Sequence, residues 1–313
     1  MSIIILSYNR YASTTKACVD SLLRDPDASG MDILVVDNGS DSETCVALRE
    51  LEKNSVVKVV YNNENIGFSA GNNIGLRQAR ADSFVLLNSD TIVPPKAITT
   101  LRRYLVDNPD WGAVGPVSNA VGNEQLIWGD KRNKEEVMFA GKEWVCHAKG
   151  STTPTSQLSF FCVGFLRNVW EQVGDLDEGF GKGYYEDADY CLRITQTGKP
   201  LMIAEDVFIY HQGSASFGRQ PVETRELMRS NKKRLLARYG RSVELLHLRE
   251  ANLRSLKYYL REKERLSGAQ LDSLRYRFEN RLKLGWEQMP RGWFKRWSYR
   301  RRLEAVEKAW TVT

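Results

Sequence analysis

Long hydrophobic runs, cysteines and histidines are all scarce in this sequence, and each shortage excludes a class of protein. The 313 residues contain no run of 18 or more apolar residues, so the sequence predicts no transmembrane helix. The apolar opening from Met1 to Ser7 lacks a basic stretch and is too short for a signal peptide, so we expect a first strand there. The five cysteines are scattered and odd in number, which argues against zinc ligands and favours buried free thiols in a reducing cytosol.

Charge is unevenly distributed, although the net charge is only +6. From residue 225 onward the chain has 24 Lys and Arg against 10 Asp and Glu, a local charge of about +14, and the remainder carries about −8. A basic tail on an acidic body predicts two regions with different roles. Nucleic acid or an anionic membrane surface could each be the partner of the tail.

The first 90 residues alternate short apolar runs with amphipathic stretches. This alternation predicts an α/β fold with a mainly parallel sheet and right-handed crossovers. The expected strands are 2–6, 32–36, 56–61 and 83–87, and the expected helices follow residue 10 and cover 41–53 and 70–80. Polar residues follow three of the strands, at 8–10, 37–38 and 88–90, so we expect them along one ligand-binding edge. An ordinary turn is the alternative for Asn88-Ser89-Asp90.

The rest of the chain has a less regular pattern. We expect a helix over 91–110, a strand at 112–116, a long irregular segment at 118–158, and a helix at 167–173 after the apolar stretch 158–166. A helix from Glu186 to 198 and strands at 201–203 and 207–210 follow. Helices at 222–239, 242–265 and 269–284 then form a C-terminal helical extension. The expected domains are a catalytic domain at 1–222 and a basic helical region at 223–313.

The loop at 62–75 is rich in asparagine and glycine. Glycines let the backbone approach a ligand closely, and a helix beginning near Ser69 would offer free N–H groups to an anion. No Gly-Lys-Ser/Thr follows, so the loop is not a Walker A motif, and it does not follow the first strand as a dinucleotide fingerprint would. A simple turn is the alternative.

Three acids, Glu186, Asp187 and Asp189, lie within four residues after a glycine-rich loop. Acids in a first helical turn can simply complement the helix dipole. The functional alternative is a general base at the wall of a cleft, because a well-placed carboxylate can accept a hydroxyl proton.

His211 follows the last expected strand and is one of only three histidines. A lone histidine at a strand end is more often structural than a ligand. A neutral imidazole is nevertheless a common ligand for transition metals, and together with a carboxylate and a diphosphate it would suit Mn²⁺, with Mg²⁺ tolerated.

The segment 291–302 mixes aromatic and basic residues. Such a mixture suits a bilayer interface, where aromatic rings lie at headgroup depth and cations meet anionic lipid. The equally weighted alternative is a helical subdomain that docks these aromatics on the body of the protein or on a twin subunit.

The ordered motifs resemble those of inverting family 2 glycosyltransferases with the GT-A fold, including rhamnosyl- and galactosyltransferases. The resemblance covers residues 2–217 and is much weaker after about 222. The matching segments are IIILSYNR (3–10), VVDNGS (35–40), NIGFSAGNN (65–73), LNSDT (87–91), FGKGYYEDADYCLR (180–193) and HQGS (211–214).

The resemblance implies a role for each matched segment. Asp37 corresponds to the aspartate that reads a uracil or thymine ring, and Asp187 to the general base, with Glu186 beside it. Asp90 and His211 correspond to residues that hold the metal on the donor diphosphate. The implied nucleotide and donor contacts are Ser7, Tyr8, Arg10, Asp37, Asn65, Gly67, Gly71, Asn72, Asn88, Ser89 and Asp90.

The sequence departs from the family pattern at Asn88, where the fuller form of the motif has aspartate. Asparagine can hydrogen-bond to a sugar but supplies no charge to a metal. We therefore expect Asp90 to carry more of the metal binding.

The expected activity is metal-assisted (Mn²⁺ or Mg²⁺) transfer of a sugar from a UDP- or dTDP-sugar to a hydroxyl of a growing bacterial glycan, free or lipid-linked. The expected location is cytoplasmic, with contact to the inner face of the membrane or a homodimer as options for the tail. A nucleotidyltransferase is the alternative, although the first strand lacks its glycine-rich basic loop. A nucleic-acid-binding protein ranks lower, because the basic tail explains nothing before residue 220.

Overall fold

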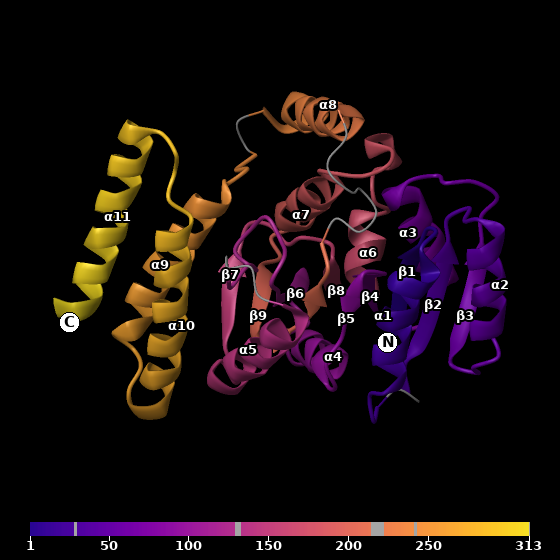
Figure 1. Cartoon of the computed structure of the whole chain (residues 1–313), viewed down its shortest axis with the longest axis horizontal. Coiled ribbons are helices and arrows are strands. Elements are labelled where there is room, and N and C mark those ends of the chain that lie inside the picture. The colour runs from indigo at the N-terminus through magenta and orange to yellow at the C-terminus, as the bar shows by residue number, and fades with distance from the viewer. Residues whose placement is uncertain (28–29, 129–132, 214–221, 241–242, 313) are drawn as a thin grey trace.

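The computed structural model describes residues 1–27, 30–128, 133–213, 222–240 and 243–312, and its centre is an eight-stranded sheet (Figure 1). The strand order is β3-β2-β1-β4-β8-β6-β9-β7, and β5 and β10 form a separate two-stranded ribbon. The strands are β1 (Ser2–Ser7), β2 (Asp32–Asp37), β3 (Val57–Tyr61), β4 (Ser83–Asn88), β5 (Thr91–Ile92), β6 (Ala113–Val117), β7 (Thr152–Thr155), β8 (Cys162–Leu166), β9 (Leu201–Phe208) and β10 (Tyr210–His211).

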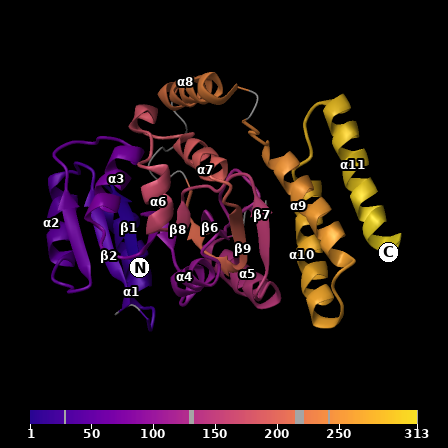
Figure 2. The ribbon, with the colours of Figure 1, turned by 180° about the vertical axis from the view of Figure 1, so that it is seen from behind.

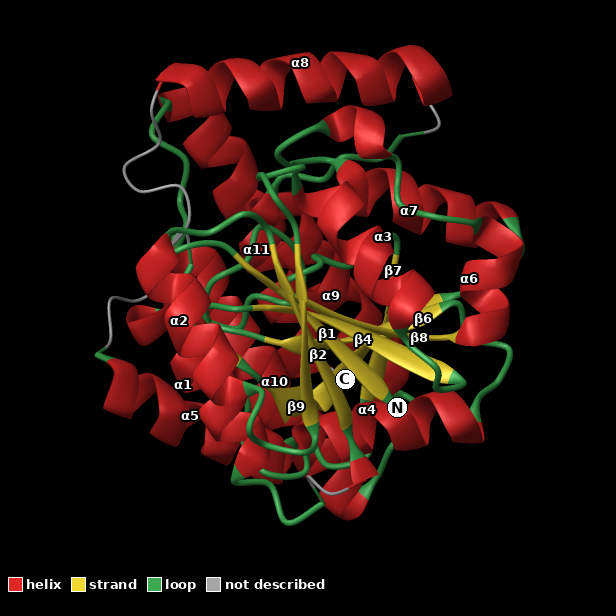
Figure 3. Ribbon diagram, turned by 90° about the vertical axis from the view of Figure 1, so that its right-hand side faces the viewer, coloured by secondary structure: helices red, strands yellow, loops and turns green. Residues whose placement is uncertain are grey.

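The helices cover both faces of this sheet, as the side view shows (Figure 3). They are η1 (Tyr11–Ser13), α1 (Thr15–Leu23), α2 (Ser42–Leu51), α3 (Phe68–Gln78), α4 (Ala97–Asp107), α5 (Lys134–His147), α6 (Arg167–Val173), η3 (Glu178–Phe180), α7 (Glu186–Gln196), α8 (Val222–Tyr239), α9 (Leu248–Lys263), α10 (Gly268–Glu287) and α11 (Trp293–Val312). Alternate residues of β1 explain the layers: Ile4 packs in one cluster with residues of α3, α5, α6 and α7, and Ile3 and Ile5 pack in the other with α1, α2 and α4.

The register of the parallel strands aligns their polar ends. Ser7 of β1 pairs with Asp37 of β2, and Leu6 pairs with Asn88 of β4. β8 runs antiparallel to β4 and pairs Cys162 with Leu87, so the start of β8 lies at the same edge. The expected mainly parallel α/β sheet flanked by helices is therefore confirmed, with β8 and β7 as its antiparallel members.

The prediction of an irregular segment at 118–158 is wrong. Helix α5 occupies its middle and β7 its end. The helix begins with a capping box between Asn133 and Glu136. It buries only Val137, Gly141 and Trp144 and leaves Phe139 exposed, so its apolar spacing is too sparse to be read as a periodic face.

Two other boundaries differ from the predictions. The expected helix at 91–110 begins only at Ala97, because Thr91 and Ile92 form β5 and two prolines follow. The two strands expected at 201–203 and 207–210 are the long strand β9 and the short strand β10. Glu205 lies in the middle of β9. In the sequence, a charged residue at this position suggests a break between two strands, but Glu205 is completely buried in the fold.

The C-terminal helices divide into two groups, which the rear view separates clearly (Figure 2). Helix α8, at the domain boundary expected at residue 222, lies over α7, and Leu235 packs against Phe180 and Ala188. Helices α9, α10 and α11 share a core of their own that includes Leu256, Phe278 and Leu303. The helices expected at 242–265 and 269–284 correspond to α9 and α10, and residues 241–242 lie outside the described residues.

A buried ion pair joins this three-helix unit to the sheet. Arg281 of α10 is 3.3 Å from Glu205 of β9, and both side chains are completely buried. The same carboxylate accepts hydrogen bonds from Tyr259 of α9 and Thr153 of β7. Helices α9 and α10 therefore support one side of the sheet whose strands end in the polar residues described above.

Candidate active site

Asp37 lies at the carboxyl end of β2 and is 1% exposed. One of its oxygens, Oδ2, accepts hydrogen bonds from the backbone N–H of Ser40 and the thiol of Cys45. The other oxygen, Oδ1, is buried and has no hydrogen-bond partner among the described residues. A buried carboxylate oxygen without a partner is costly, so this position is suited to a ligand that donates an N–H.

The neighbouring Asn38 fastens the asparagine- and glycine-rich loop onto the end of β2. Its side-chain nitrogen donates to the Oδ1 of Asn65 and to the carbonyl oxygen of Gly67. Its Oδ1 accepts from the side chain of Asn62 and the N–H of Ile66. All the hydrogen-bonding capacity of the Asn38 side chain is thus used to hold the loop beside Asp37.

The side chains predicted to surround the nucleotide after β1 differ in accessibility. Tyr8 and Arg10 are exposed at the edge, and Asn9 and Arg10 have left-handed backbone conformations that turn the chain there. Ser7 is completely buried, its hydroxyl bonds with that of Thr15, and its carbonyl accepts the N–H of Asn38. Tyr8 and Arg10 are therefore the accessible members of this predicted group.

The residues predicted to contact the donor in the loop and in α3 also differ in position and contacts. Asn65 and Gly67 lie in the loop itself, and a Cβ on Gly67 would come within 2.2 Å of the carbonyl oxygen of Gly181. Gly71 instead allows α3 to approach β1, because a Cβ there would meet Leu6. Asn72 is buried and donates to the carbonyl oxygen of Phe68 within its own helix. Gly67 thus brings the donor loop against the glycine loop that precedes the acidic pair.

Asp90 and His211 meet although they are far apart in the sequence. Pairing of β5 with β10 places His211 opposite Thr91, and the Nε2 of His211 lies 3.2 Å from the Oδ1 of Asp90. The imidazole ring stacks on Phe161, which precedes β8, with ring centroids 5.1 Å apart. Asn88 and Ser89 are half-buried at the end of β4, next to this pair, and Ser214 of the same motif lies outside the described residues.

The hydrogen bonds of His211 define its tautomer. The Nδ1 atom is 2.7 Å from the carbonyl oxygen of Ala120, which can only accept, so Nδ1 carries a proton. In the neutral ring, Nε2 then faces the Asp90 carboxylate with a lone pair. Two facing acceptors need a cation between them, and a proton or a metal ion would satisfy both.

The residues at this position fit a divalent metal. Two cis ligands of an octahedral cation with bonds of about 2.1 Å lie about 3 Å apart, close to the separation of Asp90 and His211. One carboxylate and one imidazole form a donor set suited to Mn²⁺. Within the described part of the chain no group of three or more His, Cys, Asp or Glu is arranged for a metal.

The acidic pair lies at the start of α7, after a strained loop. Tyr184 and Tyr185 have positive φ angles of 74° and 73°, a conformation that side chains other than glycine rarely adopt. Such strain concentrates at functional sites and persists only where surrounding contacts enforce it. Here it directs Glu186 and Asp187 into the first turn of α7.

Burial raises the pKa of both Glu186 and Asp187 above the ordinary range of carboxyl groups. The charge of Asp187 raises the pKa of Glu186 further. The N–H of Ala188 donates to Asp187, which limits the rise in the pKa of Asp187. Two adjacent carboxyl groups with raised pKa values form a pair that can take up one proton near neutral pH.

The third acid of this cluster, Asp189, has a structural role. It is completely buried and accepts hydrogen bonds from Arg193 of α7 and from Arg238 and Tyr239 of α8. Helix α8 also places Asn231 against the strained loop. Helix α8, the first helix of the basic region, therefore contacts both the loop before the acidic pair and Asp189 after it.

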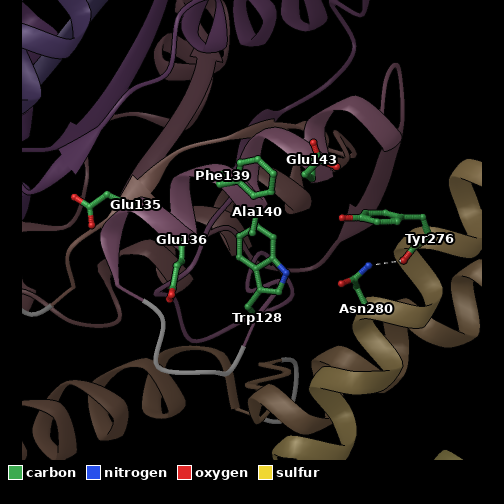
Figure 4. Close-up of a pocket in the computed structure, with 8 residues that line it drawn as sticks. All are labelled: Trp128, Glu135, Glu136, Phe139, Ala140, Glu143, Tyr276 and Asn280. Carbon is green, nitrogen blue, oxygen red and sulfur yellow. Dashed lines mark hydrogen bonds between the residues drawn. The ribbon is translucent and has the colours of Figure 1, made fainter.

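A separate hollow of about 760 Å³ lies between α5 and α10 (Figure 4). Its walls carry three aromatic and three carboxylate side chains and one amide: Trp128, Phe139, Tyr276, Glu135, Glu136, Glu143 and Asn280. Burial, followed by the negative charges of Glu135 and Asp90, raises the pKa of Tyr210. Strand β10, which carries Tyr210 and His211, contacts helix α5, which forms one wall of the hollow.

Several residues that shape the site were not predicted. Asn38 was visible within a quoted motif, but its anchoring role depends on a loop 27 residues away. The carbonyl oxygen of Ala120 and the buried side chain of Asn231 had no signal in the sequence.

Comparison with known proteins identifies the family. A profile described as glycosyl transferase family 2 matches residues 2–170, more than half of the chain. The hyaluronan synthase of Pasteurella multocida is 25% identical over 241 residues, which cover 68% of this chain but only 24% of that protein. The low-salt glycan biosynthesis hexosyltransferase Agl10 of Haloferax volcanii is 27% identical over 180 residues, 52% of each chain.

The fold is also shared with solved structures. The crystal structure of GalNAc-T7 with UDP, GalNAc and Mn²⁺ superposes with a TM-score of 0.58 at 14% identity, covering 90% of this chain and 54% of that one. This similarity confirms the expected GT-A fold. The chain belongs to glycosyltransferase family 2.

Proposed function

We propose that this glycosyltransferase is inverting and metal-dependent and transfers a sugar from a UDP- or dTDP-sugar to a hydroxyl of a growing bacterial surface glycan. The observation that carries this proposal is the Asp90–His211 pair, in which a carboxylate and a tautomer-fixed imidazole face each other at 3.2 Å at the ligand edge of the sheet. Rhamnosyl and galactosyl donors, including galactofuranosyl donors, rank first.

The nucleotide would bind at the ends of β1 and β2. The unpartnered Oδ1 of Asp37 is suited to accept the ring N–H of uracil or thymine. Tyr8 and Arg10 are accessible beside it, and Asn65 and Gly67 line the adjoining loop. Asn88 and Ser89 would then contact the sugar or ribose without adding charge.

Asp90 and His211 would hold the metal, Mn²⁺ or Mg²⁺. A divalent ion at this position supplies positive charge to the leaving diphosphate, worth several kcal/mol in comparable enzymes. Phe161 and Ala120 keep the His211 ring in the orientation that directs Nε2 toward Asp90.

Asp187 would act as the general base, with Glu186 beside it. In a direct displacement the acceptor oxygen forms a bond to the anomeric carbon as the bond from that carbon to the diphosphate oxygen breaks. The electron pair leaves with the diphosphate, and Asp187 takes the hydroxyl proton, a contribution of about 10²–10⁴-fold. Attack opposite the leaving group inverts the anomeric centre and requires no enzyme nucleophile.

The hollow between α5 and α10 would receive the acceptor glycan. Phe139 and Glu143 of α5 face Tyr276 and Asn280 of α10 across it (Figure 4). Aromatic rings pack against the C–H faces of sugars, and carboxylates accept their hydroxyl hydrogens. Helix α5, which forms one wall of this surface, contacts strand β10, which carries His211.

The decisive experiment is a panel of nucleotide sugars incubated with Mn²⁺, with release of UDP or dTDP as the readout. We expect release from a UDP- or dTDP-sugar, its loss in Asp187→Asn with donor binding retained, and loss of Mn²⁺-dependent donor binding in Asp90→Ala. Asp107→Asn, an exposed change on α4, is the control. Near-normal turnover of Asp187→Asn would refute the base, and unchanged UDP affinity in Asp90→Ala with Mn²⁺ would refute the metal role.

A further inference from the structure

The N-terminal end of α11 extends beyond the helices against which the rest of α11 packs. Every residue from 291 to 297 is exposed. Trp293, Phe294 and Trp297 form an aromatic patch on α11, with 79%, 67% and 45% of their surfaces exposed. Phe294 and Trp297 stack with ring centroids 6.0 Å apart, so the patch is a contiguous surface.

This aromatic patch is not the face with which α11 joins its neighbours. The inner face carries Tyr299, Leu303 and Val306, which are buried against residues of α9 and α10. At about 100° per residue, the centres of the two faces are about 160° apart around the helix. Folding of the three-helix unit therefore leaves the patch uncovered, and large exposed apolar patches mark contact surfaces.

The surroundings of the patch are strongly basic. Residues 291–302 contain six Lys and Arg and no Asp or Glu. Arg300 and Arg302 pair with Glu304 and Glu250, and the guanidinium of Arg301 lies 5.0 Å from the ring centre of Trp297. Lys295 and Arg296 are exposed beside the aromatic side chains.

We propose that this end of α11 docks the protein on the surface of an anionic lipid bilayer. Exposed Trp and Phe insert at headgroup depth, and adjacent Lys and Arg are attracted to anionic headgroups. The contact is peripheral, since no helix in the part of the chain that the structure describes is long and apolar enough to cross a bilayer.

The placement of the patch fits this partner. The N-terminal end of α11 and the carboxyl ends of β1, β2 and β4 both point toward the upper side in Figures 1 and 2. A bilayer that touches the patch would therefore lie on the side where the candidate active site opens. A lipid-linked acceptor would reach the enzyme from that side.

A second copy of the chain fits the patch less well. A symmetric dimer places the same patch of each subunit against the other. The basic segment 291–302 would then face its own positive charge across a low-dielectric interface, which is unfavourable. Charge complementarity therefore favours an anionic surface over self-association.

Vesicle sedimentation of the full-length protein tests the proposal. Vesicles of phosphatidylcholine with a quarter phosphatidylglycerol should bind the wild type at 100 mM NaCl, and pure phosphatidylcholine should bind it at least tenfold less. The variant Trp293→Ser/Phe294→Ser/Trp297→Ser should lose at least tenfold in binding to the anionic vesicles. Lys295→Glu/Arg296→Glu should also weaken binding, and 500 mM NaCl should release the wild type.

Matched controls change exposed residues of the same kinds on the body. Val46→Ser/Val106→Ser removes exposed apolar side chains from α2 and α4, and Lys53→Glu/Lys58→Glu reverses exposed charges. Both should bind vesicles like the wild type. Brominated lipids should quench wild-type tryptophan fluorescence, and Trp293→Phe/Trp297→Phe should lose most of this quenching.

Each of the following outcomes overturns the proposal: no binding to anionic vesicles, equal binding by the triple serine variant, or a dimer that the triple serine variant dissociates without any lipid binding. Salt-sensitive binding to single-stranded DNA in place of vesicles would also overturn it. Release of UDP or dTDP from free donor does not depend on the membrane, so failure here leaves the proposed transfer reaction untouched.

Discussion

Asn231 of α8 donates its side-chain amide to the carbonyl oxygen of Gly183 at 2.8 Å, across 48 residues of sequence. The same nitrogen lies 2.8 Å from the carbonyl oxygen of Phe180 and 3.1 Å from that of Tyr184. Asn231 is buried, and the loop it holds contains the two strained tyrosines that precede the acidic pair. A helix from the basic region therefore holds the backbone that presents Glu186 and Asp187.

Asn231→Ala should lower kcat about tenfold to a hundredfold and leave the KM for donor within about threefold. Removing the amide leaves buried carbonyl groups without a donor and lets the strained loop relax, and small displacements of a catalytic group cost rate more than binding. Steady-state kinetics with the purified variant measures both constants. Arg234→Ala on the same helix removes an exposed ion pair with Asp177 and a cation–π contact with Phe180 but none of the hydrogen bonds to the strained loop, so it should retain kcat. A rise in KM without a fall in kcat would contradict the positioning role.

The pH dependence of kcat should show an acid limb above the range of ordinary carboxyl groups. Burial raises the pKa of Asp187, and the base must be deprotonated to accept the hydroxyl proton. Activity is therefore present above the raised pKa and declines as the pH falls through it. The profile of kcat from pH 4 to 9 at saturating donor measures the limb, and a limb near the ordinary aspartate value of about 3.9 would contradict the assignment.

Glu186 and the metal provide controls for this profile. Burial raises the pKa of both Glu186 and Asp187, and the charge of Asp187 adds to the rise at Glu186. Glu186→Gln keeps a neutral side chain of similar shape beside Asp187, which remains buried, so the acid limb should stay above the range of ordinary carboxyl groups. A tenfold increase in Mn²⁺ should also leave it in place, whereas a limb caused by loss of metal would move to lower pH.

The sequence was most informative where a signal is local. Each apolar run that ends in polar residues marked a real strand end, because the apolar strand and its polar terminus are adjacent in the chain. The approach of His211 to Asp90 depends on pairing between β5 and β10, which no local pattern reports. Their proximity followed only from the family resemblance, and their metal-binding role remains a prediction.

The features that the sequence did not predict correctly also have physical causes. Helix α5 was missed because it buries few apolar residues and leaves Phe139 exposed. Strand β9 was divided because Glu205 is polar, and its partner Arg281 lies 76 residues further along the chain. The contact of Asn231 is equally non-local, since one asparagine in a basic helix has no distinguishing pattern.

Asn88→Asp should strengthen metal binding by about tenfold, or about 1.4 kcal/mol. Asn88 ends β4 two residues before Asp90, and a carboxylate there would add negative charge next to the proposed metal ligands. Titration of activity with Mn²⁺ measures the half-saturating concentration, which should fall. Ser89→Ala, which adds no charge, is the control. An unchanged Mn²⁺ requirement in Asn88→Asp would mean that residue 88 faces the donor and not the metal.

Glu205→Gln should destabilise the protein by about 3 kcal/mol, because it leaves Arg281 as a buried charge without its partner. Burial alone would raise the pKa of Glu205, but the charges of Arg281 and Arg277 hold it below the ordinary value. A lowered pKa in the folded state stabilises the protein above the unfolded value of about 4.3, and this stability is lost as the pH falls through the folded pKa.

Thermal unfolding from pH 3 to 8 measures both effects. The wild type should lose stability toward acid pH, and Glu205→Gln should show a smaller dependence from a lower starting stability. Glu304→Gln removes only an exposed pair with Arg300 and should change the unfolding free energy by less than about 1 kcal/mol. Equal stability of Glu205→Gln and the wild type would mean that packing alone braces α9 and α10 against β9. A lower kcat in a folded Glu205→Gln would instead show that this brace also supports the hollow proposed for the acceptor, since α10 carries Tyr276 and Asn280.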